Sequence, residues 1–254
     1  TSDLPYSEPL SLVEGENIIL ALSVADNGLV SPLSTFGYTI GGIIEEVLFT
    51  DPAIETAIRS ILNVEVDDIL FTNDLWSITE FSVPSDAVSY SDLKYLSFLE
   101  ELRINNGVSD ELYFISALEH LSVLEISNTL VSEDNLIMIS ELPKLTRLVL
   151  HSCSISSIEA LTPAVNLISL DLSNNTIRNL KALSSMTRLQ ELILQHNAVT
   201  DLSAISSITS LTKLDVSYNA LTSIAPVSKL SNLTWLDTSA NTISDLGEID
   251  QLAG

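Results

Sequence analysis

The segment Leu167-Ile-Ser-Leu170-Asp-Leu172-Ser-Asn-Asn175-Thr-Ile177 decides the fold, because the chain repeats its pattern at a constant interval. The segments that begin at Leu189, Leu211 and Leu233 have nearly the same apolar positions, each 22 residues after the one before. A fixed period of about 20 to 50 residues is the sequence signature of a solenoid, whose repeats stack on their neighbours. We therefore expect a stack of short repeats rather than a globular core.

Four weaker copies precede these four. Segments that begin at Leu145 and Leu121 keep the spacing, although the second lies 24 residues upstream because its linker is longer. Leu99 begins another copy, and Ile78 begins a degenerate first one. About eight repeats are therefore predicted for residues 78–254.

The shared pattern LxxLxLxxNxI resembles that of leucine-rich-repeat proteins. The alternating LxL core predicts a short strand with one buried face, and parallel strands stack at about 4.8 Å. The resemblance implies an α/β solenoid: a right-handed superhelix with a parallel concave β-sheet, short turns or 3-10 pieces on the convex side and a helical N-terminal cap.

A column of small polar residues follows the strands. A buried asparagine there can satisfy backbone groups of the turn, where an unpaired donor or acceptor costs about 1–3 kcal/mol. The predicted ladder consists of Thr129, Cys153, Asn175, Asn197, Asn219 and Asn241, with Asp86 at the same position of the degenerate repeat. We accordingly interpret Cys153 as a buried structural residue rather than a reactive thiol.

The short repeat and its Asp201-Leu-Ser-Ala-Ile205 segment resemble internalin-type repeats of bacterial surface proteins. A eukaryotic intracellular class has much the same repeat length. The segment that precedes the regular repeats favours the bacterial class. It combines an Asp51-Pro52 helix with Ile78-Thr-Glu-Phe81, and this order is similar to the segment before many bacterial repeat arrays. The resemblance extends from about Asp51 to the end.

Residues 49–77 are expected to form the helical cap. Asp51 suits the N-cap and Pro52 the first helical position, and one apolar stripe follows. This stripe consists of Ile54, Ala57, Ile58, Ile61 and Leu62. The last residues, 250–254, are in phase with a further repeat, so we expect the array to continue or to be capped beyond the C-terminus.

Residues 1–48 lack the period and predict strands within 10–24 and 35–42. This small β-rich segment resembles the first strands of bacterial immunoglobulin-like modules, but it has about half the usual length. It is either a partial module or a strand pair packed on the cap. The start at Thr1, without an initiator Met or a leader pattern, indicates a mature or trimmed chain.

Composition excludes several classes of partner. The net charge of −24 disfavours nucleic acid and anionic membranes. Mean hydropathy is +0.34, yet no apolar run approaches the roughly 18 residues of a membrane span, so direct membrane insertion is not expected. A single cysteine excludes an internal disulfide framework.

No pattern for chemistry emerges. His120, His151 and His196 lack a metal-ligand spacing, and no nucleophile elbow or phosphate loop is present. Asp171 and its counterparts Asp215 and Asp237 share a column that suggests a solvated acidic stripe more than a calcium site. We therefore predict no enzyme, no cofactor and no metal.

The solvent-facing strand positions carry apolar, aromatic and basic residues where serine or aspartate would suffice. These candidate partner-binding residues are Val123, Arg147, Val149, His151, Ile193, His196, Tyr218 and Trp235. Such a composition is typical of interaction hot spots, although Val and Ile are also good strand formers.

The sequence thus predicts an extracellular or cell-surface adhesion protein that binds a protein or glycan ligand on its concave face. Two alternatives remain: a structural subunit of an extracellular filament that self-assembles through its termini, and an intracellular scaffold. Asn174 and Asn232 both match the glycan acceptor pattern. We expect Asn174 to be bare, because a sugar there would shield the predicted binding face.

Overall fold

The computed structural model describes residues 15–21, 34–40, 44–107 and 112–244. The chain forms two compact units, one of Thr1–Val47 with Ile69–Asp74 and one of Leu48–Asp68 with Leu75–Gly254. The expectation that repeats continue or are capped beyond residue 254 lies outside the described residues. Along those described stretches, no helix is both long and apolar enough to cross a membrane.

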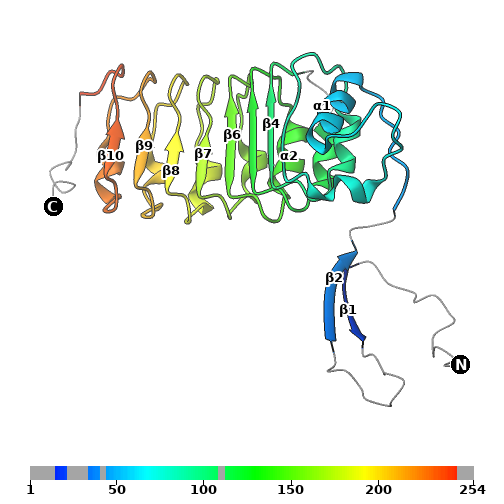
Figure 1. Ribbon diagram of the computed structural model, residues 1–254. Coiled ribbons are helices and arrows are strands. Elements are labelled where there is room, and N and C mark those ends of the chain that lie inside the picture. Colours follow the sequence, from blue (N-terminus) through cyan, green and yellow to red (C-terminus); the bar gives the residue numbers. More distant parts are fainter. Residues whose placement is uncertain (1–14, 22–33, 41–43, 108–111, 245–254) are drawn as a thin grey trace, which may run out of the picture. The chain divides into compact units, whose positions relative to one another are not determined.

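The larger unit contains one parallel sheet of eight strands in chain order, from β3 at one edge to β10 at the other (Figure 1). The strands are β3 Glu80–Ser82, β4 Glu101–Asn105, β5 Val123–Ser127, β6 Arg147–His151, β7 Ser169–Asp171, β8 Glu191–Ile193, β9 Lys213–Asp215 and β10 Trp235–Asp237. Each strand pairs with the equivalent residues of the next repeat, as in the register Leu148 to Leu170. The predicted solenoid with its parallel sheet is confirmed.

Short helices close the repeats behind the sheet. The 3-10 helices are η1 Thr72–Ser77, η2 Ser91–Tyr95, η3 Leu112–Ala117, η4 Glu159–Leu161, η5 Lys181–Ser185, η6 Ser203–Ile205 and η7 Ala225–Lys229. The longer 24-residue repeat instead forms the α-helix α2, Glu133–Ser140, which starts with a capping box between Ser132 and Asn135. The short convex pieces are as expected, and this helix is an addition to them.

The core lies between the sheet and these helices. The central leucine of each strand from Leu102 in β4 to Leu214 in β9 is fully buried. Each such side chain contributes about 1.5–3 kcal/mol through the area it removes from water. Leu236 of β10, the last described strand, is only partly covered.

Helix α1, Pro52–Leu62, caps the first repeat with Asp51 as its N-cap residue. One oxygen of Asp51 accepts from the N–H groups of Ala53 and Ile54, and the other accepts from Val88 and Ser89 in the loop after β3. Burial alone would raise the pKa of Asp51, but these four N–H groups lower it below its ordinary value. Asp51 therefore joins the helix to the first repeat.

The position that the sequence predicts for the ladder residue of this first repeat is different in the structure. Asp86 is exposed to solvent, so it is not a ladder member. The predicted apolar stripe of α1 is also narrower than expected: Ile54 and Ile58 are buried, but Ile61 is 53% exposed. The first repeat therefore covers α1 at Ile54 and Ile58 but leaves Ile61, in the last turn of the helix, exposed.

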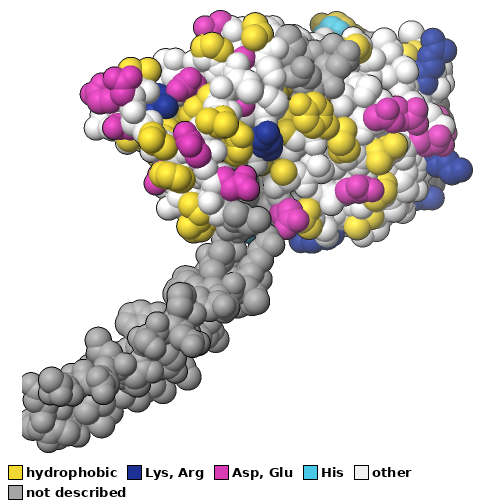
Figure 2. All heavy atoms as spheres, turned by 90° about the vertical axis from the view of Figure 1, so that its right-hand side faces the viewer, with side chains coloured by type: hydrophobic (Ala, Val, Ile, Leu, Met, Phe, Trp, Pro, Cys, Tyr) yellow, Lys and Arg dark blue, Asp and Glu magenta, His cyan; other side chains and the backbone are white. Residues whose placement is uncertain are grey.

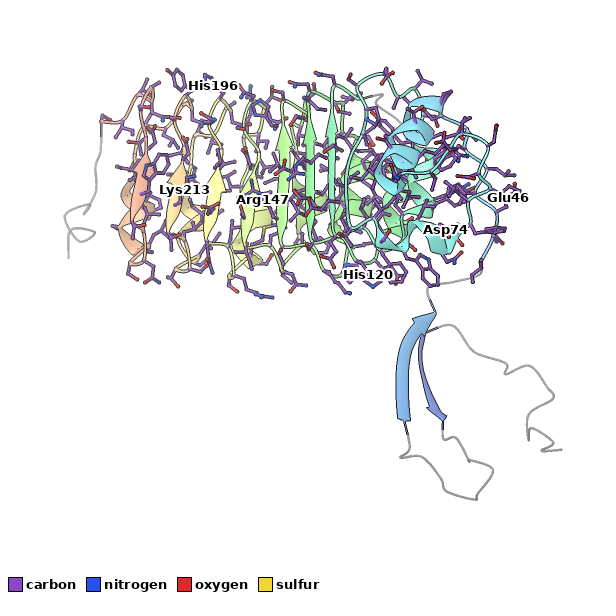
Figure 3. The ribbon with its side chains drawn as sticks, viewed as in Figure 1. Glu46, Asp74, His120, Arg147, His196 and Lys213 are labelled. Carbon is purple, nitrogen blue, oxygen red and sulfur yellow. The ribbon has the colours of Figure 1, made fainter. Side chains whose placement is uncertain are left out.

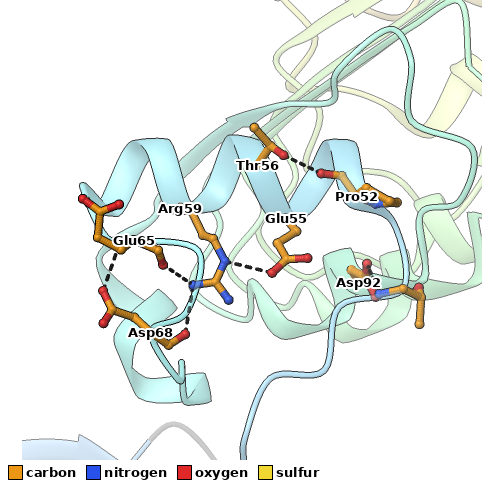
Figure 4. Close-up of polar contacts among 8 residues, drawn as sticks. Pro52, Glu55, Thr56, Arg59, Glu65, Asp68 and Asp92 are labelled. Atoms are coloured by element: carbon orange, nitrogen blue, oxygen red, sulfur yellow. Dashed lines mark hydrogen bonds and ion pairs between the residues drawn. The ribbon is translucent and has the colours of Figure 1, made fainter.

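The turn after α1 is held by Arg59. Its Nε binds Glu55 Oε1 at 2.8 Å, and its Nη1 donates to the carbonyl oxygens of Glu65 and Asp68 at 2.8 and 2.9 Å (Figure 4). At the N-terminal end of the helix, the buried Asp92 accepts from the N–H and hydroxyl of Thr50. Arg59 therefore holds the cap together internally, and Asp92 joins the cap to the repeats.

The smaller unit contains an antiparallel pair of strands, β1 Gly15–Ala21 and β2 Ser34–Ile40. Strands occur in both segments where the sequence predicts them. An isolated bridge between Glu46 and Phe71 also belongs to this unit. A relationship to immunoglobulin-like modules stays a prediction.

Candidate binding surface

The side chain of Asn175 shows how the ladder holds the turns. It is buried, and its Oδ1 accepts from the N–H groups of Cys153 and Ile155 at 3.1 and 2.9 Å. Its Nδ2 donates to the carbonyl oxygens of Leu150 and Leu172 at 2.7 and 2.9 Å. One amide therefore connects two consecutive repeats.

The next three asparagines repeat this arrangement with partial exposure. Oδ1 of Asn197 accepts from Ile177, that of Asn219 from Val199 and that of Asn241 from Leu221. Each Nδ2 also donates to a carbonyl of its own repeat and one of the preceding repeat. The ladder therefore ties each repeat to the one before it.

Thr129 and Cys153 continue this column with weaker polar groups. Thr129 Oγ1 accepts from the N–H of Gly107 and donates to the carbonyl of Ser127, both at 2.9 Å. The Cys153 thiol lies 3.3 Å from the carbonyl oxygen of Ile126, and burial raises its pKa to about 11. The thiol is thus protonated and shielded at neutral pH.

The residue before each ladder position adopts the left-handed backbone conformation, with φ between 52° and 56°. These residues are Asn106, Asn128, Ser152, Asn174, His196, Tyr218 and Ala240. His196 and Tyr218 therefore do not lie on the strands, as the sequence analysis assumed, but in the turns beyond them. Left-handed backbone costs residues other than glycine and asparagine roughly 1–2 kcal/mol, so two large rings here are unexpected.

The aspartates of the third strand column serve the backbone. Asp171, Asp215 and Asp237 each accept from the N–H of the serine two residues later. Asp215 is 9% exposed, so the predicted solvated acidic stripe is wrong at this position. Across the described part of the chain, no group of three or more metal-ligating side chains is present.

His151 belongs to a hydrogen-bonded chain rather than a free surface. Its Nδ1 lies 2.8 Å from Ser173 Oγ, which donates to Asp171 Oδ1 at 2.5 Å. Ser173 is fully buried. Because its proton points to the aspartate and its oxygen is inaccessible, this trio is unsuited to nucleophilic catalysis.

A column of rings lies near the amino ends of the first strands. Phe98 packs between Trp76 and His120, with centroid distances of 5.4 and 5.1 Å. These residues follow one another at the repeat spacing of 22. His120 therefore stabilises the junction of cap and repeats.

Charged side chains on the outer face of β4 to β6 pair with one another. Arg103 contacts Glu101 and Glu125, and Arg147 lies 3.5 Å from the same Glu125. Arg147 also reaches Ser169 in β7 at 3.4 Å. The exposed Arg147 of the predicted set is thus already engaged within the sheet.

The apolar members of the predicted set differ in accessibility. Val123, Val149 and Ile193 are partly covered by their neighbours. Trp235 is 44% exposed, and the ammonium of Lys213 lies 5.5 Å from its ring centroid. In Figure 3, Lys213 and Arg147 lie near the middle of the strands' length, whereas His196 lies beyond the carboxyl ends of the strands and His120 beyond their amino ends.

The rings of His196 and Tyr218 stack on each other, with centroids 4.1 Å apart and planes inclined by 15°. His196 is exposed, and Tyr218 is 53% exposed. We define the C-terminal aromatic surface as His196, Tyr218, Lys213 and Trp235. It comprises the large exposed rings on the described strands and turns of the last three repeats.

Sequence reasoning missed an apolar area at the capped end of the larger unit. Leu48, Ile61, Val66 and Val88 are all more than half exposed there. Figure 2 shows this end, where hydrophobic side chains alternate with acidic ones. No periodic pattern marks these residues, because three of them lie in loops.

Comparisons with known proteins agree with this architecture. The sequence pattern of the family described as leucine rich repeat matches residues 143–199. Internalin C2 from Listeria monocytogenes is 28% identical with a TM-score of 0.73, covering 81% of this chain and 91% of that chain. Internalin InlF from the same species is 24% identical with a TM-score of 0.59, covering 80% and 73%.

A leucine-rich-repeat protein of Leptospira interrogans is 24% identical with a TM-score of 0.64, covering 71% of this chain and 48% of that one. No curated protein matches the sequence. The likeness to internalin C2 identifies the solenoid as internalin-like. The fold is therefore that of an internalin-like leucine-rich-repeat solenoid.

Proposed function

We propose that this internalin-like leucine-rich-repeat chain is a secreted or surface-displayed adhesion protein that binds a protein partner through its sheet face. The main supporting observation is the C-terminal aromatic surface. Trp235 and Tyr218 are accessible to solvent there, although the repeat pattern does not require an aromatic residue at either position. Aromatic residues are enriched among interface hot spots. Extracellular display is proposed from the likeness to internalins.

The sheet face supports a contact at its C-terminal part more than at its middle. A partner that covers Arg103 and Arg147 must desolvate charges already paired with Glu125, which returns little free energy. Trp235 presents apolar area to water, and removing that area stabilises a complex by about 25 cal/mol per Å². The partner footprint should therefore centre on β8 to β10.

The test requires a partner identified by affinity capture and then measured with purified protein. Trp235→Ser should weaken binding by about tenfold or more, as hot-spot truncations do. Val66→Ser removes an apolar side chain at the capped end that is more exposed than Trp235, 72% against 44%, and serves as the control. Equal affinities of wild type and Trp235→Ser, with a loss in Val66→Ser, would contradict the proposal.

One observation favours a second candidate function. The exposed Leu48, Ile61, Val66 and Val88 suit end-to-end assembly into an extracellular filament, because large apolar side chains gathered at one end of a solenoid are typical of contact sites. Sedimentation over a wide concentration range tests it. A chain that stays monomeric at high concentration rules out assembly. A sedimentation coefficient that rises with concentration in the wild type but not in Val66→Ser would establish it.

A further inference from the structure

We propose that the stacked rings of His196 and Tyr218 form an incomplete column that a guanidinium group of the partner completes, stacked on Tyr218 above Ala240. This inference rests on the proposed function and specifies the chemistry of one contact. The rings follow the repeat, because their 4.1 Å separation is close to the spacing of neighbouring strands, about 4.8 Å. A third planar group would occupy the next repeat.

The next repeat leaves that place open. Ala240 occupies the position equivalent to Tyr218, with the same left-handed backbone and with its methyl group exposed. On the opposite side of the pair, Asn174 fills the equivalent position and approaches His151. Among the described residues, the column of rings therefore begins at His196 and ends at Tyr218.

The exposed face of Tyr218 has no described competitor. Its one ring contact among the described residues is His196, and its hydroxyl makes no hydrogen bond there. A ring in left-handed backbone is not needed for the fold, because asparagine, serine and alanine occupy the same column elsewhere. Strain kept without a structural benefit points to binding.

Charge selects the guanidinium over other planar groups. The chain carries 34 acidic and 10 basic residues. Between Glu191 and Ser244 four acidic residues accompany two lysines, one of which already lies over Trp235. A planar cation is favoured both by this excess of negative charge and by the face of a tyrosine ring. The flat guanidinium of arginine can stack parallel to the ring, whereas the ammonium of lysine contacts a ring only as a point charge.

The test follows the Tyr218 ring resonances by NMR during titration of the full chain with arginine amide. Citrulline amide is the matched control, since it is planar and nearly isosteric but neutral. We expect arginine amide to shift these resonances with an affinity about two- to fivefold higher than citrulline amide. Equal responses, or stronger binding of phenylalanine amide or N-acetylglucosamine, would overturn the assignment.

Two variants locate the site. Tyr218→Asn should stay folded, since Asn174 has the same backbone conformation, and arginine amide should no longer shift the ring resonances of the neighbouring His196, which it shifts in the wild type. Ala240→His should fill the open position and block the probe while the Tyr218 resonances remain observable. Binding that persists in a folded Ala240→His would refute the column.

The two proposals fail separately. If arginine amide does not bind while Trp235→Ser still weakens the partner, only the guanidinium contact is wrong. If substitution of Trp235 or Tyr218 leaves the affinity for the partner unchanged while arginine amide binds, the proposed binding face is wrong and only the guanidinium site on Tyr218 remains.

Discussion

Replacing the ladder asparagines by alanine should destabilise the protein. The loss should be larger for an asparagine whose Oδ1 accepts from two backbone N–H groups than for one whose Oδ1 accepts from one. Asn197 Oδ1 is the one described acceptor for the N–H of Ile177. The carbonyl oxygens of Leu172 and Leu194 also receive bonds from Asn175 and Asn219, respectively. In Asn197→Ala, the N–H of Ile177 therefore loses its acceptor, but both carbonyl oxygens keep a hydrogen-bond donor. This predicts that the free energy of unfolding falls by about 1–3 kcal/mol.

Asn175→Ala should cost more, about 2–6 kcal/mol, since it strands two amides, those of Cys153 and Ile155. Urea unfolding monitored by circular dichroism measures the difference, with amide hydrogen exchange to locate it where the array does not unfold in two states. Gln190→Ala, an exposed amide in the same repeat as Asn197, is the control and should be neutral. Equal losses for Asn175→Ala and Asn197→Ala would refute the reasoning.

Four further outcomes are expected. Since the folded pKa of Asp51 is lowered from 3.8, its stabilisation is complete above that value and lost as pH falls through the folded pKa; urea midpoints of wild type and Asp51→Asn should converge in acid, and a constant gap would contradict this. Cys153 should react with a thiol reagent only at the unfolding rate, because its pKa is about 11; fast native labelling would disprove its burial. Deletion of residues 1–62 should expose the first repeat and cause aggregation, whereas a monomeric, cooperative fragment would show that α1 is dispensable. Peptide mass mapping should find Asn174 bare, and a stoichiometric glycan there would favour the structural role.

The repeats are predictable because the period specifies both burial and register. Leucines at LxL positions and the ladder residues 153 and 175 lie where the spacing places them, since a one-residue slip would turn every leucine to solvent. The N-cap at Asp51 is equally local: a carboxylate followed by proline suits one helix start. Such features depend on neighbours along the chain or one repeat away.

The surface is less predictable because it depends on which side chains pair across repeats. Arg147 looks free in sequence but lies against Glu125 and Ser169. The sequence pattern suggests that Tyr218 is a strand residue, yet it has left-handed backbone and lies in the turn after β9. The exposure of Ile61 likewise follows from how much of α1 the first repeat can cover.

The most direct test of the binding surface is hydrogen exchange of the full chain with and without its identified partner. We predict that the partner slows exchange of backbone amides in β9 and β10 and in the turns that contain His196, Tyr218 and Ala240, while α1 and β3 to β5 exchange as in the free protein. Protection confined to α1 and the loop around Val88 would contradict the account and assign binding to the capped end instead.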